Sequence, residues 1–244
     1  METLFVGQNC IELNSVDSTN TFLLNYCSSN TVLEGTVVVA HEQTKGRGQR
    51  GNTWYSEADK SLCMSVVLMP KTSVKHQFLL NKCISLAICD ALSEIHINAH
   101  IKWPNDIFVQ NKKIAGILIE NTIRGQILNQ SIIGIGINVN NQINSLISAV
   151  SIKQLLKRKV DLKILISILC KHIEFYYLGF KNNTIKVDRM YQNRLYGLNQ
   201  VVNFEKDGVE FMAKILGVDD FGRLILEKEG CQLHFGVGEL SFKI

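Results

Sequence analysis

The sequence predicts an α+β protein, with a mixed or antiparallel sheet domain followed by a small β domain. Three observations support this fold class. Strand-like segments within residues 99–139 are joined by turns too short for parallel crossovers, so neighbouring strands must be antiparallel. Residues 76–95 repeat apolar side chains at helical spacing. After Gly197 the pattern changes to short strands at short intervals, which is typical of a small barrel-like domain.

The N-terminal elements follow from local signals. A helix is expected over residues 17–27, and any of its first four residues can cap it. Residues 36–40 form a β-branched run typical of a buried strand. A polar, glycine-rich loop then extends from 43 to about 60, and residues 61–69 form another strand that ends at Pro70.

The remaining elements lie on either side of a boundary near residue 197. Strands are expected at 99–103, 107–110, 114–120 and 127–139, and helices at 163–180 and 184–196. Beyond the boundary, strands are expected at 201–204, 209–218, 224–227 and 231–235. The domains are therefore predicted to be 1–196 and 197–244.

Composition excludes several classes of protein. The 244 residues are 46% hydrophobic and 20% charged, as in ordinary globular chains, and the net charge of +4 is too small to indicate nucleic-acid binding. No apolar run approaches the roughly 20 residues that span a bilayer, and no signal peptide is recognisable, so we expect a cytoplasmic protein without a membrane partner. The seven cysteines and six histidines show no metal-ligand spacing, so no protein-bound metal is expected.

The loop from Gln43 to Trp54 is the richest stretch for chemistry. Its three glycines let the backbone turn N–H groups toward a ligand, and its three cations favour an anion. A solvated basic hairpin tip explains the same residues equally well. The GxGxxG pattern in this loop does not indicate a dinucleotide site, because a strand and not a helix follows it.

Three further clusters are weak signals individually. Residues 102–106 (Lys-Trp-Pro-Asn-Asp) place a cation, an amide and a carboxylate at a strand end, where a simple turn is the alternative. Residues 112–116 follow two lysines with a small Ala-Gly pair, although such lysines are usually solvated edge charges. Residues 134–140 put glycines inside an apolar strand, which indicates a close approach of ligand or backbone, or a bulge.

Together and in this order, the clusters resemble the biotin–protein ligase family over nearly the whole chain. The residues that carry the resemblance are Asp17-Ser18-Thr19-Asn20, the loop with Gln43, Gly46-Arg47-Gly48, Gly51 and Trp54, Lys102-Trp103-Pro104-Asn105-Asp106, Lys113 to Glu120, and Gly134-Ile135-Gly136-Ile137-Asn138. The tail, with Gly217-Val218-Asp219, Gly222, Leu224-Ile225-Leu226 and Gly238-Glu239-Leu240-Ser241, is similar to the family's SH3-like end domain.

Two departures from the family pattern matter. Gln49 and Asn52 stand where the family loop often has arginine, and both changes remove a cation. Only 16 residues precede Asp17, too few for the DNA-binding module of some members. We therefore expect a monofunctional ligase that does not bind DNA.

The resemblance implies the biotin/lipoate ligase fold with a small C-terminal SH3-like β-barrel, and a two-step reaction. Biotin and ATP give biotinyl-5′-AMP, with Mg²⁺ on the polyphosphate, and biotin is then transferred to a lysine of a biotin carboxyl carrier protein. Loop 44–56 is expected to be mobile when empty and closed over the intermediate. The family contains both monomers and homodimers, and both remain open for this chain.

The resemblance also assigns roles to residues. The implied biotin-binding residues are Ser18, Thr19, Asn20, Gln43, Gly46, Arg47, Gly48, Gln49, Trp54, Lys113 and Gly116. The implied ATP- or adenylate-binding residues are Arg47, Arg50, Lys102, Asn105, Lys113 and Asn138. The implied catalytic residues are Lys113, Arg47 and Asp106, the last orienting or deprotonating the incoming lysine.

Two alternatives remain at this point. A lipoate–protein ligase or octanoyltransferase shares the fold, but the arginine- and glycine-rich stretch typical of those families is not found. A non-catalytic binding module is the alternative from another class. No aromatic and basic RNA-binding stripe supports it.

Overall fold

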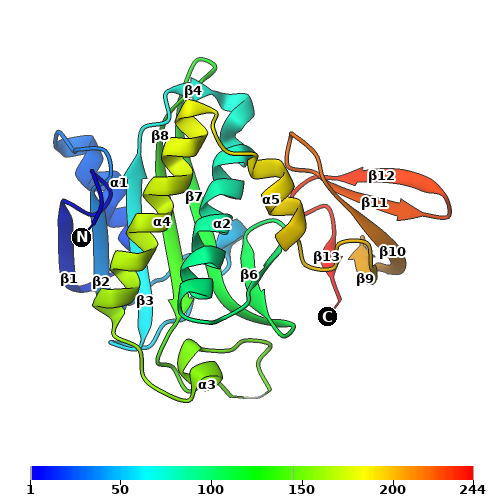
Figure 1. Ribbon diagram of the computed structural model, residues 1–244, viewed down its shortest axis with the longest axis horizontal. Helices are drawn as coiled ribbons and strands as arrows, with labels where there is room; N and C mark the ends of the chain where they lie inside the picture. Colours follow the sequence, from blue (N-terminus) through cyan, green and yellow to red (C-terminus); the bar gives the residue numbers. More distant parts are fainter. Residues whose placement is uncertain (1, 145, 244) are drawn as a thin grey trace.

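The first of two sheets forms the centre of the molecule (Figure 1). The computed structural model describes residues 2–144 and 146–243. Strand order in this sheet is β1-β2-β3-β8-β7-β6-β5, and the short β4 pairs with β8 beside this path. The strands are β1 (Cys10–Val16), β2 (Val37–Gln43), β3 (Ser61–Leu68), β4 (Thr72–Ser73), β5 (His100–Lys102), β6 (Asp106–Val109), β7 (Lys112–Arg124) and β8 (Ile127–Asn138).

Five α-helices accompany the two sheets. They are α1 (Thr19–Ser29), α2 (Gln77–Glu94), α3 (Ile152–Leu156), α4 (Leu162–Asn182) and α5 (Val187–Arg194), with short 3₁₀ turns at Gln49–Gly51 and Val74–His76. The predicted helices are confirmed with small shifts at their ends. Strand β1 and helix α3 were not predicted, because α3 has only five residues and β1 alternates exposed with half-buried positions, which leaves little apolar signal.

Pairing directions agree with the turn lengths. Strands β5 to β8 are antiparallel to their neighbours, as their short connections require. By contrast, β1 and β2 are parallel, with Cys10 opposite Val37, because helix α1 forms the crossover between them. This one pair makes the sheet mixed, as predicted.

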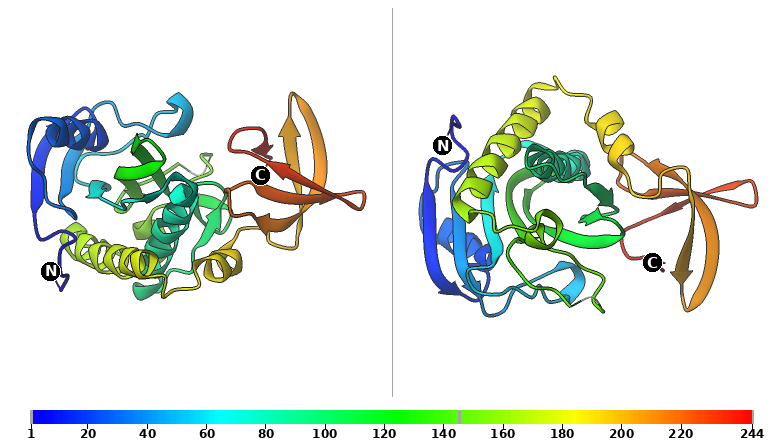
Figure 2. Two further views of the ribbon diagram at one scale, coloured as in Figure 1. Left: turned by 90° about the horizontal axis from the view of Figure 1, so that it is seen from above. Right: turned by 60° about the horizontal axis from the view of Figure 1, so that its bottom comes forward.

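Alternating side chains give the sheet two different faces. Val37, Val66 and Ile135 belong to the large core under α2 and α4. Their neighbours Val38 and Val67 point the other way and join a smaller cluster with Leu23 of α1. The sheet is therefore covered on one face by the long helices α2 and α4 and on the other by α1 (Figures 1 and 2).

Small residues leave a hollow on the face of the sheet that α1 covers, beside the first turn of that helix. In the register of the central strands, Ser65 lies opposite Gly134, Cys63 opposite Gly136, and Gly136 opposite Gly116. No side chain larger than cysteine rises from these positions. The sequence of three neighbouring strands thus creates the floor of a cavity.

The second sheet lies beyond α5 and contains the C-terminal strands (Figure 2). It is antiparallel, as predicted, with the order β12-β11-β10-β9-β13. Within the described residues this order is an open path from β12 to β13, and a closed barrel was expected. The strands are β9 (Val201–Lys206), β10 (Val209–Val218), β11 (Leu224–Lys228), β12 (Cys231–Phe235) and β13 (Ser241–Phe242).

The turn between β10 and β11 attaches this sheet to the rest of the molecule. The indole N–H of Trp103 donates to the carbonyl oxygen of Gly222 at 2.8 Å. The buried Lys82 of α2 pairs with Asp188 of α5 at 2.7 Å and donates to the carbonyl of Asp219 at 3.4 Å. These contacts fix the second sheet against α2 and the strand end at residue 103.

Candidate active site

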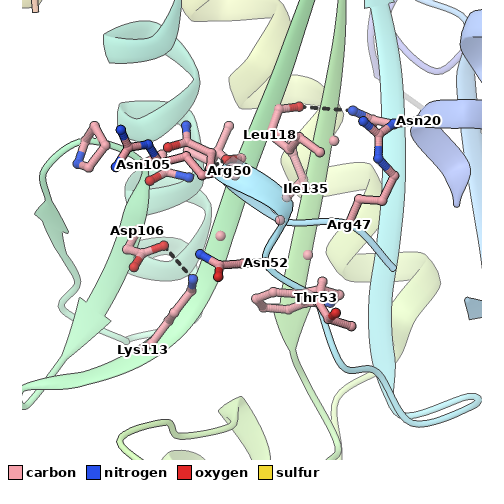
Figure 3. A pocket seen from close by; sticks show the side chains of 18 of the residues that line it. Asn20, Arg47, Arg50, Asn52, Thr53, Asn105, Asp106, Lys113, Leu118 and Ile135 are labelled. Atoms are coloured by element: carbon pink, nitrogen blue, oxygen red, sulfur yellow. Dashed lines mark hydrogen bonds and ion pairs between the residues drawn. The ribbon is translucent and has the colours of Figure 1, made fainter. Parts of the chain in front are cut away.

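A cavity of about 320 Å³ opens over the glycine floor (Figure 3). That volume lies at the lower end of the range for small-molecule sites. Six parts of the chain meet there: the start of α1, the glycine-rich loop, strand β3, the strand end at 102–106, the central strands β7 and β8, and the C-terminal segment 237–242. The predicted site residues that line it are Ser18, Thr19, Asn20, Gln43, Arg47, Gly48, Gln49, Arg50, Trp54, Lys102, Asn105, Asp106, Lys113 and Gly116.

The first turn of α1 gives the cavity a buried, neutral polar end. Gln43 Oε1 accepts hydrogen bonds from the backbone N–H and the hydroxyl of Thr19, at 2.8 and 3.0 Å. Ser65 Oγ donates to Asn20 Oδ1 at 2.6 Å, and Asn20 Nδ2 donates to the Leu118 carbonyl at 3.2 Å (Figure 3). Ser18 is the N-cap residue, yet its side chain makes no cap hydrogen bond. Its hydroxyl therefore remains free for a ligand.

The glycine-rich loop folds as a narrow hairpin across the cavity. The N–H of Gly48 donates to Asn52 O at 2.7 Å, and the N–H of Trp54 donates to Gly46 O at 3.0 Å. A Cβ at Gly46 would lie 2.3 Å from the Trp54 carbonyl oxygen, so glycine is required there. The hairpin thus uses the N–H of Gly48 for itself and presents arginine side chains to the cavity.

The indole of Trp54 lies flat on the glycine floor. A Cβ at Gly136 would come within 2.4 Å of the ring, and one at Gly116 within 3.3 Å. The indole N–H is buried and makes no hydrogen bond within the described residues. The nitrogen lies against the floor, 2.7 Å from where a Cβ at Gly136 would stand, so a side chain at Gly136 would displace the indole.

Two cations of the cavity are paired with carboxylates. Lys113 Nζ lies 2.6 Å from Asp106 Oδ1 (Figure 3), and it also lies 5.5 Å from the centre of the Trp54 ring. Arg47 Nη2 lies 2.9 Å from Glu120 Oε1. Glu120 also accepts a hydrogen bond from Asn20 at 2.9 Å, so it joins the polar end of the site to the arginine.

The strand end at 102–106 contributes a third cation and an amide. Burial lowers the pKa of the Lys102 ammonium, and the nearby carboxylate of Asp106 partly offsets this effect. The amide of Asn105 donates to the Ile117 carbonyl at 2.6 Å, while Ile117 N–H donates to Asn105 O. Asn105 therefore fastens this turn to β7, while its side-chain oxygen and its second amide N–H remain for a ligand.

Two predicted residues do not line the cavity. Gly46 belongs to the hairpin but lines a separate hollow outside this cavity, and Asn138 is buried at the end of β8 opposite Ser61. Sequence reasoning gave no role to Ser65, Glu120 or the segment 237–242, which the structure brings into or beside the site. Strand periodicity could have placed Ser65 and Glu120 on the same face as the glycines. Nothing local in the sequence connects residues 237–242 with this site.

Comparison with known proteins agrees with this geometry. Residues 12–138 match the model of the biotin/lipoate A/B protein ligase family. The bifunctional ligase/repressor BirA of Bacillus subtilis is 30% identical over 234 residues, covering 93% of this chain and 72% of that protein. The biotin–[acetyl-CoA-carboxylase] ligase of Mycobacterium tuberculosis is 27% identical and covers 91% and 85% of the two chains.

Solved structures show the same similarity. The biotin protein ligase of Aquifex aeolicus, in complex with biotin and ATP, superimposes with a TM-score of 0.80 and 29% identity, covering 97% of this chain and 99% of that one. The fold and the cavity define a small-molecule ligase of this type. The chain belongs to the biotin/lipoate A/B protein ligase family.

Proposed function

We propose that this protein is a biotin–protein ligase, which activates biotin with ATP to biotinyl-5′-AMP and transfers biotin to a specific lysine of a biotin carboxyl carrier protein. One observation carries the proposal most directly: a single cavity joins a buried neutral polar end, an apolar floor and a cationic end. This sequence of surfaces matches a neutral ureido ring, an apolar body and a carboxylate beside phosphates. The similar Aquifex enzyme was solved with biotin and ATP.

The polar end suits the ureido group of biotin. Ser18, Thr19 and Asn20 are each at most 3% exposed, so hydrogen bonds made there are shielded from water. A dithiolane or an alkyl chain offers no hydrogen bond to these polar side chains, and in particular none to the Ser18 hydroxyl, which makes no cap bond. The site therefore favours biotin over lipoate or octanoate. Trp54 and the glycine floor would contact the apolar rings of biotin.

The cationic end suits the first chemical step. A carboxylate oxygen of biotin attacks the α-phosphorus of ATP and pyrophosphate leaves, so two anions must approach each other. Lys113 at this end would offset their repulsion and the charge that develops at phosphorus, joined by Arg47 once the hairpin closes, since Arg47 lies beside Asn20 at the polar end in this structure (Figure 3). Each is held by a carboxylate before the ligand arrives, Arg47 by Glu120 and Lys113 by Asp106. Arg50 and Lys102 add positive charge on the nucleotide side, where the Asn105 oxygen would also bind.

The second step transfers the biotinyl group. The neutral amine of the carrier lysine attacks the carbonyl of the mixed anhydride, AMP leaves, and the amine loses a proton. Asp106, the acidic residue of the cavity lining, would orient that amine or accept its proton. Before transfer the anhydride must be kept from water, which the hairpin of loop 44–56 would do by closing.

Three further parts of the proposal concern metal, domains and location. Mg²⁺ would be held mainly by ATP oxygens and water, because Asp106 is already paired with Lys113. Residues 1–196 would bind biotin and ATP, and residues 197–244 would form the SH3-like domain. No helix among the described residues is long and apolar enough to cross a membrane. We place the enzyme in the cytoplasm with its carrier protein.

Trapping the activated intermediate tests the function without knowledge of the carrier. Hydroxylamine attacks an acyl adenylate and releases the acyl hydroxamate and AMP. With ATP, Mg²⁺ and biotin, we expect biotin hydroxamate and AMP in equal amounts, and neither product without biotin. Hydroxamate formation from lipoate or octanoate in place of biotin would contradict the proposal, as would its absence from folded protein.

A further inference from the structure

The four cations of the cavity are held in two different ways. Arg47 and Lys113 are paired with carboxylates, as described above. Arg50 instead donates to the carbonyl oxygen of Gly238 at 2.9 Å. Lys102 Nζ lies 4.9 Å from the centre of the Phe108 ring and 5.0 Å from that of Phe242, and it makes no ion pair within residues 2–144 and 146–243. Neutral groups thus hold the second pair of cations, and two of those groups belong to segment 237–242.

The group that a cation contacts determines how available that cation is to an anionic ligand. A carboxylate neutralises the charge and occupies N–H donors, so it must be displaced when a phosphate arrives. An aromatic face attracts an ammonium through its quadrupole without cancelling the charge. Lys102 therefore keeps its full charge and its donors, while the two rings restrict where its ammonium lies.

The structure also explains why the Phe242 ring stays in place. Phe242 lies opposite Phe204 in the pairing of β13 with β9, and the two rings make an edge contact at 4.9 Å. Phe204 is fully buried in the core of the second sheet. The next backbone N–H, of Lys243, donates to Asn203 O at 2.9 Å. The second sheet thus holds one aromatic ring beside the cavity.

We propose that Phe242 is a positioning residue for nucleotide binding, whose ring, with that of Phe108, holds the Lys102 ammonium ready for the phosphates of ATP. This inference rests on the proposed function, since it takes the polyphosphate as the ligand of Lys102. Burial lowers the pKa of Lys102 and the charge of Asp106 opposes this effect, so the ammonium is poorly solvated by water and the ring faces act beside the Asp106 carboxylate. The second sheet accordingly contributes directly to the ligand site, in addition to its packing against α2.

Equilibrium binding of α,β-methylene-ATP, measured by calorimetry on the full chain with biotin and Mg²⁺ present, tests the role of Phe242. We expect Phe242→Leu to raise Kd about threefold to tenfold, between the effects of an exposed and of a fully desolvated cation–π contact. Replacing Phe242 by 3,4,5-trifluorophenylalanine keeps the ring's shape and weakens its quadrupole, so it should have a similar effect. Phe211→Leu is the matched control, because Phe211 lies 5.4 Å from Lys228 in the same sheet but does not line the cavity. Its Kd should stay within about twofold of wild type.

Repeating the measurement in a Lys102→Met protein distinguishes an effect of Phe242 on the Lys102 ammonium from an effect of Phe242 on packing. In Lys102→Met, Phe242→Leu should leave the already weakened Kd nearly unchanged, because the contact is gone. Wild-type affinity in both Phe242 variants would overturn the inference, as would an equal loss in the two backgrounds. If the leucine variant fails to fold, the fluorinated variant alone decides. A wild-type protein that forms biotin hydroxamate but shows no effect at Phe242 would refute only this inference. A wild-type protein that binds nucleotide through Phe242 without forming hydroxamate would refute only the proposed function.

Discussion

Gly134→Ala should weaken biotin binding strongly, because the structure leaves no room for a methyl group there. A Cβ at Gly134 would lie 2.4 Å from Asn20 Oδ1, well inside contact distance. Asn20 cannot move without losing hydrogen bonds to Ser65, Leu118 or Glu120. A displaced Asn20 amide would no longer reach the ureido ring, and losing one or two hydrogen bonds of about 1 kcal/mol each to biotin gives about 2 kcal/mol and an increase of about thirtyfold in Kd for biotin.

Calorimetric titration with biotin alone measures this effect, and thermal unfolding monitors the fold. The Asn20→Ala variant supplies the control, since it removes the clashing amide. In that background Gly134→Ala should change Kd by less than about threefold. A Gly134→Ala protein that is folded and binds biotin as tightly as wild type would show that Asn20 does not form the polar end of the site.

Three other predictions address the loop, the second sheet and the N-terminus. Gln49→Arg adds a cation at the cavity and should slow release of biotinyl-5′-AMP about two- to fivefold, because an exposed ion pair contributes up to about 1 kcal/mol. An unchanged release rate in a stopped-flow measurement would contradict this prediction. Burial raises the pKa of Asp219, but hydrogen bonds from the backbone and side chain of Arg223 and from His234 outweigh it and hold the pKa at about 2, below its ordinary value of 3.8. A lowered pKa stabilises the folded protein above pH 4, so about 2 kcal/mol should be lost as the pH falls from 4 to 2, and denaturant unfolding of Asp219→Asn should show a smaller loss. Glu174 accepts backbone hydrogen bonds from Leu4, Phe5 and Val6, so Glu174→Ala should cost about 3 kcal/mol and lower Tm by about 8 °C, and a drop below about 2 °C would refute this anchoring.

The predictable part of the fold consists of strongly periodic or tightly connected elements. Helix α2 was evident from its apolar side chains at helical spacing over residues 76–95, and the structure packs it against the sheet, α4 and α5. The hairpins β5 to β8 followed from turn length alone. Strand β1 escaped prediction because its side chains alternate between exposed and half-buried at a sheet edge, which leaves little apolar signal. Its parallel pairing with β2 is a tertiary property that no local pattern specifies.

The candidate site also has features that the sequence predicted and features that only the structure shows. The glycines at 116, 134 and 136 were singled out as positions of close approach, and the structure supplies the reason, since Trp54 and Asn20 lie directly on them. Glu120 was quoted only within a motif, because its pairing with Arg47 joins residues far apart in the chain. The contribution of Phe242 and Gly238 depends on how the second sheet is attached to the first. That attachment runs through Trp103 and the turn at Gly222, and becomes visible only in three dimensions.

The most direct test of the proposed activity is biotin-dependent exchange of labelled pyrophosphate into ATP, with purified protein and Mg²⁺. Exchange reports reversible formation of the acyl adenylate at this cavity and requires no carrier protein. The account predicts exchange with biotin and none with lipoate, and it predicts loss of exchange in Lys113→Ala. Exchange that depends on lipoate, or no exchange from a folded sample that binds neither ligand, would contradict it.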